Sequence, residues 1–177
     1  MDKKGISILT TSAVILLLFR CMLMTEGRTS MGYQFLFLQT KTALDVTETA
    51  YRTIKANQTA VEALRGGFGV SECWNYTLDE DERLADNYGR LNIFKRYAKD
   101  LNITIDVIVS LGNVQRAIKH KRKSLGLPRI QSTTTHVSNM NISKKNMDVI
   151  QAALLSNLEK NLFLMLNDFD LRSQKTA

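Results

Sequence analysis

The chain has 177 residues, with 24 Lys or Arg against 17 Asp or Glu, a net charge of +7, two cysteines and one proline. A domain of this length can bury a sufficient hydrophobic core by itself, and two cysteines exclude a disulfide-rich scaffold. Because proline interrupts helices, its scarcity permits long helices almost anywhere in the chain.

The N-terminal segment has the layout of a secretory signal peptide. Lysines precede an apolar run, Ile6–Phe19, that is shorter than the roughly 20 residues of a membrane span. We therefore expect residues 1–27 to be a signal peptide, with cleavage somewhere in 22–30. Residues 28–177 are then one secreted, extracellular domain in which Cys73 is the single cysteine.

Apolar residues recur at helical spacing from about Tyr33 to Leu64 and predict one long amphipathic helix. Glycines follow it and favour a helix end. A second helix is predicted to begin after Asp79, a favourable N-cap with three acids behind it, and to run to about Leu101. Its apolar stripe contains Leu84, Tyr88, Leu91, Phe94 and Ala98.

The segment Ile103–Leu111 is rich in β-branched residues, so a strand competes with a helix there. The spacing of Leu111, Ile118 and Leu125 favours a third helix, with Thr104 as its cap. A Thr-, Ser- and Asn-rich connection follows from Gly126 to about Ser143. The last helix, predicted from Lys144 to about Leu171, is the most apolar; its stripe contains Met147, Ile150, Leu154, Leu158, Met165 and Phe169.

These elements predict an all-α four-helix bundle. Long connections after the first and third helices, with a short one between, fit an up-up-down-down long-chain cytokine topology, because parallel neighbours need a crossover of the full bundle length. The first connection, of roughly fourteen residues, would have to be nearly extended.

Four Asn-x-Ser/Thr sequons predict glycosylated, solvent-facing positions in a secreted chain. They lie at Asn57, Asn75, Asn102 and Asn141. A basic run, Lys119–Lys123, has two interpretations: a solvated helix end that complements the helix dipole, or a contact with a polyanion such as heparan sulfate. Specific nucleic-acid binding is not expected.

The sequence contains no recognisable catalytic constellation. It lacks a Gly-rich phosphate loop, a CxxC, HExxH or GxSxG motif, and a histidine partner for Cys73. The acids Asp79–Glu82 are interpreted as exposed capping charges. We therefore expect no enzymatic activity, no cofactor and no metal site, and a function that resides in the molecular surface.

Two stretches resemble the helical cytokines of the interleukin-6 group, closest to ciliary neurotrophic factor, cardiotrophin-like cytokine and leukaemia inhibitory factor. Trp74 followed by Glu82-Arg83-Leu84-x-x-Asn87 and then Phe94 is similar to the entry of the family's second helix. Asp170-Leu171-Arg172 resembles the close of its last helix. The spacing from the tryptophan to the Glu-Arg-Leu run is one residue longer here.

The resemblance implies a ligand that assembles cell-surface receptor chains, a shared signal-transducing subunit and a ligand-specific one, through three patches. In the family, the tryptophan loop and the end of the last helix face the ligand-specific subunit, which points to Trp74, Asp170 and Arg172. A second patch uses a Phe-x-x-Lys pair, and Ile142 and Lys145 take that place with isoleucine replacing phenylalanine. The third patch falls around Lys41, Asp45, Lys119 and Arg122.

The first interpretation is thus a secreted glycoprotein cytokine or growth factor that binds receptors and does not insert into membranes after signal cleavage. One alternative is another helical cytokine, of the interferon or interleukin-12 helical-subunit type. The other is a membrane-anchored, non-catalytic helical binding protein whose first segment is retained.

Overall fold

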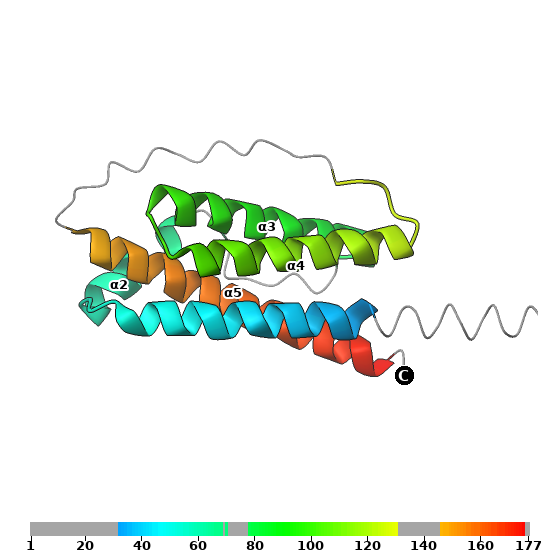
Figure 1. The fold of residues 1–177 in the computed structure, drawn as a ribbon, viewed down its shortest axis with the longest axis horizontal. Helices are drawn as coiled ribbons and strands as arrows, with labels where there is room; N and C mark the ends of the chain where they lie inside the picture. The colour runs from blue at the N-terminus through cyan, green and yellow to red at the C-terminus, as the bar shows by residue number, and fades with distance from the viewer. Residues whose placement is uncertain (1–31, 69, 71–77, 131–145, 176–177) are drawn as a thin grey trace, which may run out of the picture.

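The computed structural model describes residues 32–68, 70, 78–130 and 146–175. Throughout these ranges the regular elements are helices, which confirms the predicted all-α class (Figure 1). They are an N-terminal helix described over residues 32–53, α2 (Gln58–Arg65), the 3-10 helix η1 (Gly66–Phe68), α3 (Glu80–Asp100), α4 (Ile105–Ser124) and α5 (Met147–Lys175). The helical interpretation of Ile103–Leu111 is confirmed from Ile105 onward.

The predicted long first helix is wrong in one respect, because it breaks at residues 54–57. Asn57 has an extended backbone, and its side chain accepts a hydrogen bond from Ala60 N at 3.3 Å, so it caps a separate helix. This capping offers the backbone an alternative to a continuous helix. Leu64, which the uninterrupted stripe placed in the core, is 42% exposed.

The two central helices begin as expected. Asp79 caps α3 by accepting from Glu82 N at 2.8 Å. Thr104 takes the N-cap position of α4 but makes no capping hydrogen bond with its side chain. Gly126, at φ 70°, occupies the left-handed region and lets the chain turn back after α4.

The core is formed mainly by the apolar stripes of the long helices. In α5, buried apolar side chains occur from Ala152 to Phe169. Phe68 of η1 closes one part of this core, with its ring at 5.3 Å from that of Tyr97 in an edge-on contact. The largest fully buried side chains are Leu36, Phe68, Leu84, Leu91, Phe94, Leu101, Leu111, Ile118, Leu154, Leu155, Leu158 and Phe169.

Contacts between helix ends relate the helices to one another. Figure 1 shows the N-terminal helix beside α5 and α3 beside α4. The Tyr33 ring, near the start of the first helix, lies 6.2 Å from Phe169, near the end of α5. Gln151, near the start of α5, donates to the Leu101 carbonyl just after α3 at 2.7 Å.

The helix that precedes the connection into α3, α2, packs along α5. Asn157 Nδ2 of α5 donates to the Arg65 carbonyl at the end of α2 at 2.6 Å. The next anchor, Asp168, lies only about 17 Å further along the α5 axis at helical rise. α2 therefore ends part of the way along α5, and the predicted extended connection lies largely outside the described residues.

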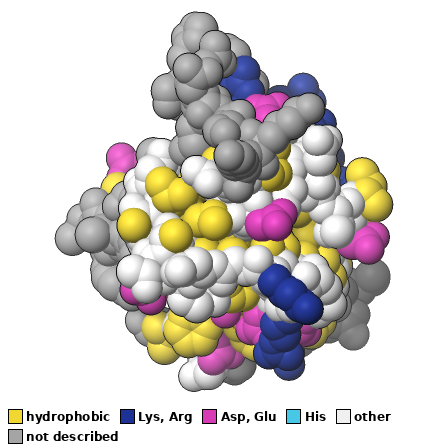
Figure 2. Space-filling view, turned by 90° about the vertical axis from the view of Figure 1, so that its left-hand side faces the viewer, with side chains coloured by type: hydrophobic (Ala, Val, Ile, Leu, Met, Phe, Trp, Pro, Cys, Tyr) yellow, Lys and Arg dark blue, Asp and Glu magenta, His cyan; other side chains and the backbone are white. Residues whose placement is uncertain are grey.

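The two ends of the helices differ in composition. Figure 2 shows the end where α4 and α5 begin, and apolar side chains gather at its surface. We call this the apolar end; the described apolar residues at its helix termini include Ile54, Ala56, Ile105, Met147 and Val149. Among the described residues, no helix combines the length and apolar character that a membrane crossing requires.

Candidate functional site

Asp168 lies at the centre of ion pairs at the other end of the molecule. Arg83 Nη1 of α3 donates to Asp168 Oδ1 at 3.3 Å, and Arg172 Nε donates to the same oxygen at 3.2 Å. Arg83 and Asp168 are only 9% and 6% exposed. Because removing either partner of a buried pair leaves an uncompensated charge, this contact holds the start of α3 to the end of α5.

Tyr33 connects three helices in the same region. Its hydroxyl donates to Glu80 Oε1. Lys121 Nζ lies 3.9 Å from the ring centroid, and Arg172 Cζ lies 5.9 Å from it. Burial, reinforced by the bond to Glu80, raises the pKa of Tyr33 far above its ordinary value, whereas burial lowers the pKa of Lys121.

Arg122 joins the end of α4 to the start of α3. Its guanidinium donates to the carbonyls of Asp81 at 2.7 Å and Pro128 at 2.9 Å, and it forms an ion pair with the Asp81 carboxylate. The interpretation of Lys119–Lys123 as a wholly solvated run is therefore wrong, because Lys121 and Arg122 are only 2% and 5% exposed. We call the whole group the charged end: Tyr33, Glu80, Asp81, Arg83, Lys121, Arg122, Asp168 and Arg172.

The predicted receptor residues at the end of α5 differ in accessibility. Asp170 is half-buried, and its carboxylate accepts from Gln174 Nε2 at 3.0 Å. Leu171 is 55% exposed. Arg172 is held by Asp168 and the Tyr33 ring, so part of its interaction capacity is used within the fold. The accessible part of this surface is thus formed by Asp170 and Leu171.

Arg122 was predicted to belong to the third exposed patch, and this prediction is wrong because its side chain is only 5% exposed. The remaining predicted positions divide into two groups. Trp74, Asn75, Asn141, Ile142 and Lys145 lie outside the described residues. Within the described ranges, side chains that were expected to face solvent and do so are Lys41, Asp45, Asn57, Asn102 and Lys119.

Exposed apolar side chains mark the outer faces of the helices. On the N-terminal helix, Phe35 and Leu38 are 50% and 57% exposed, and on α5 Phe163 is 53% exposed. Phe163 borders a groove with Leu44 and Glu48 of the N-terminal helix. This groove thus combines an exposed aromatic ring with charged side chains.

Sequence reasoning missed a buried polar network on α5. Asn161 Nδ2 donates to Asn157 Oδ1 at 2.9 Å, and Arg90 Nη1 of α3 donates to Asn161 Oδ1 at 3.2 Å. Both asparagines are fully buried. Their spacing of four residues inside the most apolar stripe was the only available signal, because their partners on α3 and α2 are distant in sequence.

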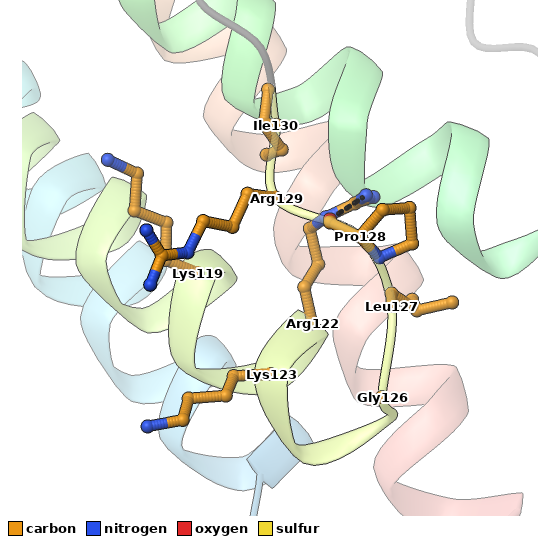
Figure 3. Close-up of a pocket in the computed structure, with 8 residues that line it drawn as sticks. All are labelled: Lys119, Arg122, Lys123, Gly126, Leu127, Pro128, Arg129 and Ile130. Atoms are coloured by element: carbon orange, nitrogen blue, oxygen red, sulfur yellow. Dashed lines mark hydrogen bonds between the residues drawn. The ribbon is translucent and has the colours of Figure 1, made fainter.

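A basic pocket of about 610 Å³ opens where α4 ends. Apolar side chains of the turn that follows, Leu127, Pro128 and Ile130, line it together with cations. Figure 3 shows Lys119, Lys123 and Arg129 directed to one side of α4, while Arg122 turns the other way towards Pro128.

Across the described residues, no group of three or more His, Cys, Asp or Glu side chains is placed to hold a metal ion. The arrangement supports binding by charge and apolar contact. Comparisons with models of known families, with curated proteins and with solved structures found no match.

Proposed function

We propose that this chain is a secreted helical cytokine of the interleukin-6 type, with an up-up-down-down four-helix arrangement, which joins a shared and a ligand-specific receptor chain at the cell surface. In this proposal the chain acts by recognising receptors with its surface and catalyses no reaction. The two exposed sequons, Asn57 and Asn102, are expected to carry glycans in the secreted form.

The observation that carries the proposal is the pairing of helix ends. Arg83 near the start of α3 contacts Asp168 near the end of α5, and Arg122 at the end of α4 contacts Asp81 at the start of α3. Lys121 of α4 likewise contacts Tyr33 at the start of the first helix. The N-terminal helix and α3 thus run from the end of the molecule where α4 and α5 finish, as an up-up-down-down order requires, whereas an up-down-up-down order would alternate helix starts and ends there.

The surface at the end of α5 supports the receptor-binding part of the proposal. Leu171 is a largely exposed apolar side chain, and its sequence neighbours Asp170 and Arg172 are partly exposed charged residues. Together these three residues form a patch that a partner protein can reach. This patch coincides with the positions that the resemblance assigns to the ligand-specific subunit.

The test is a binding screen of secreted protein against the receptor chains of the interleukin-6 group. N-terminal sequencing of the secreted material should find a start in the 22–30 region and no residual apolar segment. Leu171→Asp should weaken binding to the ligand-specific chain by about tenfold or more, since it buries a charge in the contact.

Ile105→Asp provides the matched control, because Ile105 is also exposed, at 67%, but lies at the apolar end. This variant should bind the ligand-specific chain like the unmodified protein. Absence of binding to every receptor chain at micromolar concentration, by folded protein, would disprove the proposed function. A retained N-terminal segment would favour the membrane-anchored alternative.

A further inference from the structure

The net positive charge of the chain comes from one segment. Residues 107–147 contain eight Lys or Arg and no Asp or Glu, whereas the rest of the chain holds the remaining 16 of the 24 basic residues and all 17 acidic ones. The molecule outside this segment is therefore close to neutral. Such segregation creates a local field that attracts polyanions.

Only part of this segment is used by the fold. Lys121 and Arg122 are buried in the charged end. Lys119 lies with its Nζ 5.1 Å from the Tyr88 ring centroid, which positions the side chain and leaves its charge exposed. Lys123 and Arg129 are exposed, and neither pairs with an acid of the described chain.

The turn after α4 brings the three exposed cations together. Gly126, at φ 70°, reverses the chain, and Leu127 N donates to the Arg122 carbonyl at 3.0 Å. Arg122 also holds the Pro128 carbonyl. As a result Arg129 reaches back across α4 towards Lys119 and Lys123 (Figure 3). Compensation of the helix dipole explains cations in the last turn, but Arg129 lies beyond that turn.

We propose that Lys119, Lys123 and Arg129 form a binding site for sulfated polysaccharide, with the apolar side chains of Leu127, Pro128 and Ile130 as a wall for a sugar ring. Sulfates are multiply charged acceptors that suit Lys and Arg donors, and pyranose rings present apolar C–H faces. Nucleic acid fits less well, because the described pocket offers no aromatic ring for base stacking. The choice of a sulfated polysaccharide as the ligand depends on the proposed secretion of the chain. It does not depend on the proposed binding to receptors.

The test measures binding of a heparin oligosaccharide of defined length to the full secreted chain by titration calorimetry at several salt concentrations. Lys123→Ser combined with Arg129→Ser should lower the affinity by about tenfold or more and reduce the salt dependence by about two released counterions. Lys55→Ser combined with Lys99→Ser is the matched control. It removes the same charge from exposed positions at the opposite end and should change the affinity less than about twofold.

Equal affinity of the two double variants would overturn the site. Equal competition by single-stranded RNA of the same length, or by desulfated heparin, would overturn the assigned ligand. Thermal unfolding of both double variants shows whether either of them is misfolded. In that case Lys119→Ser serves as a second variant, with an expected loss of heparin affinity of about threefold. Heparin binding without binding to any receptor chain would refute the proposed function and leave this inference intact.

Discussion

The charged end and the apolar end of the molecule are held together by different kinds of interaction. At the charged end, buried ion pairs and the hydroxyl of Tyr33 join the starts and ends of the helices. At the apolar end, side chains such as Val149 pack on the core, and Gln151 donates to the backbone carbonyl of Leu101. Charge pairs have fixed partners and geometry, whereas apolar contacts have little direction. The charged end therefore specifies which helix termini meet, and apolar burial supplies most of the stability.

The largest effect is expected from the apolar core. Phe68→Ala should lower the free energy of unfolding by about 4 kcal/mol, because Phe68 is fully buried against Tyr97 and leaves a cavity. Urea denaturation measures the change. Phe163→Ala, at a side chain that is 53% exposed, is the control and should cost less than about 1 kcal/mol. Equal losses would contradict the assigned packing of η1.

A slightly smaller loss is expected at the charged end. Asp168→Asn should cost about 3 kcal/mol, because it leaves the buried Arg83 guanidinium without its counter-charge. The double variant Arg83→Met, Asp168→Leu should recover part of this loss, since a well-packed apolar pair removes the stranded charge. Denaturation of both variants and the parent gives the comparison. A double variant that is less stable than Asp168→Asn would show that the pair is not coupled as described.

Two groups of the charged end should make the stability of the fold depend on alkaline pH. The folded pKa of Tyr33 is raised, so the folded chain keeps this proton where the unfolded chain releases it. Its contribution is complete below an ordinary tyrosine pKa of about 10 and is lost as pH rises further. Lys121 acts oppositely: its lowered pKa makes stability increase with pH until about 10.5.

Tyr33→Phe should therefore lower stability by about 1 kcal/mol at pH 8 and abolish the alkaline loss above pH 10. Thermal melts between pH 8 and 11.5 measure both effects. Tyr88→Phe is the matched control, because it removes a hydroxyl outside the charged end while keeping the ring under Lys119. A Tyr33→Phe profile identical to that of the parent would refute the role of the hydroxyl.

The smallest predicted effect compares helix caps at the two ends. Asp79→Ala should cost about 1 kcal/mol because it removes the hydrogen bond to Glu82 N. Thr104→Ala should lower the free energy of unfolding by only a few tenths of a kcal/mol, since Thr104 makes no side-chain capping bond. Unglycosylated protein should be used, because Thr104 belongs to the Asn102 sequon. Equal losses would mean that the caps do not differ as the structure indicates.

Helical periodicity predicted the elements that depend on local pattern. The apolar stripe of α3, the Asp79 cap and the turn at Gly126 agree with the structure, because each depends on residues close in sequence. The break at Asn57 was missed because its sequon indicated exposure equally well on a continuous helix. Leu64 was then placed on the wrong face.

The site was less predictable than the fold. The partners of Asp168 and of Arg122 lie on other helices, and no local pattern in one sequence reveals such pairs. Arg172 was assigned to the receptor surface, and the structure places it between that surface and the ion pairs of the fold. Trp74, Ile142 and Lys145 lie outside the described residues and stay predictions.

Because the net positive charge of the chain lies in residues 107–147, the charge distribution of the molecule has a dipole moment. Such a moment orients a protein before any contact forms. If the chain is secreted as proposed, the outer side of α4 would therefore be the first part of it to contact an anionic cell surface.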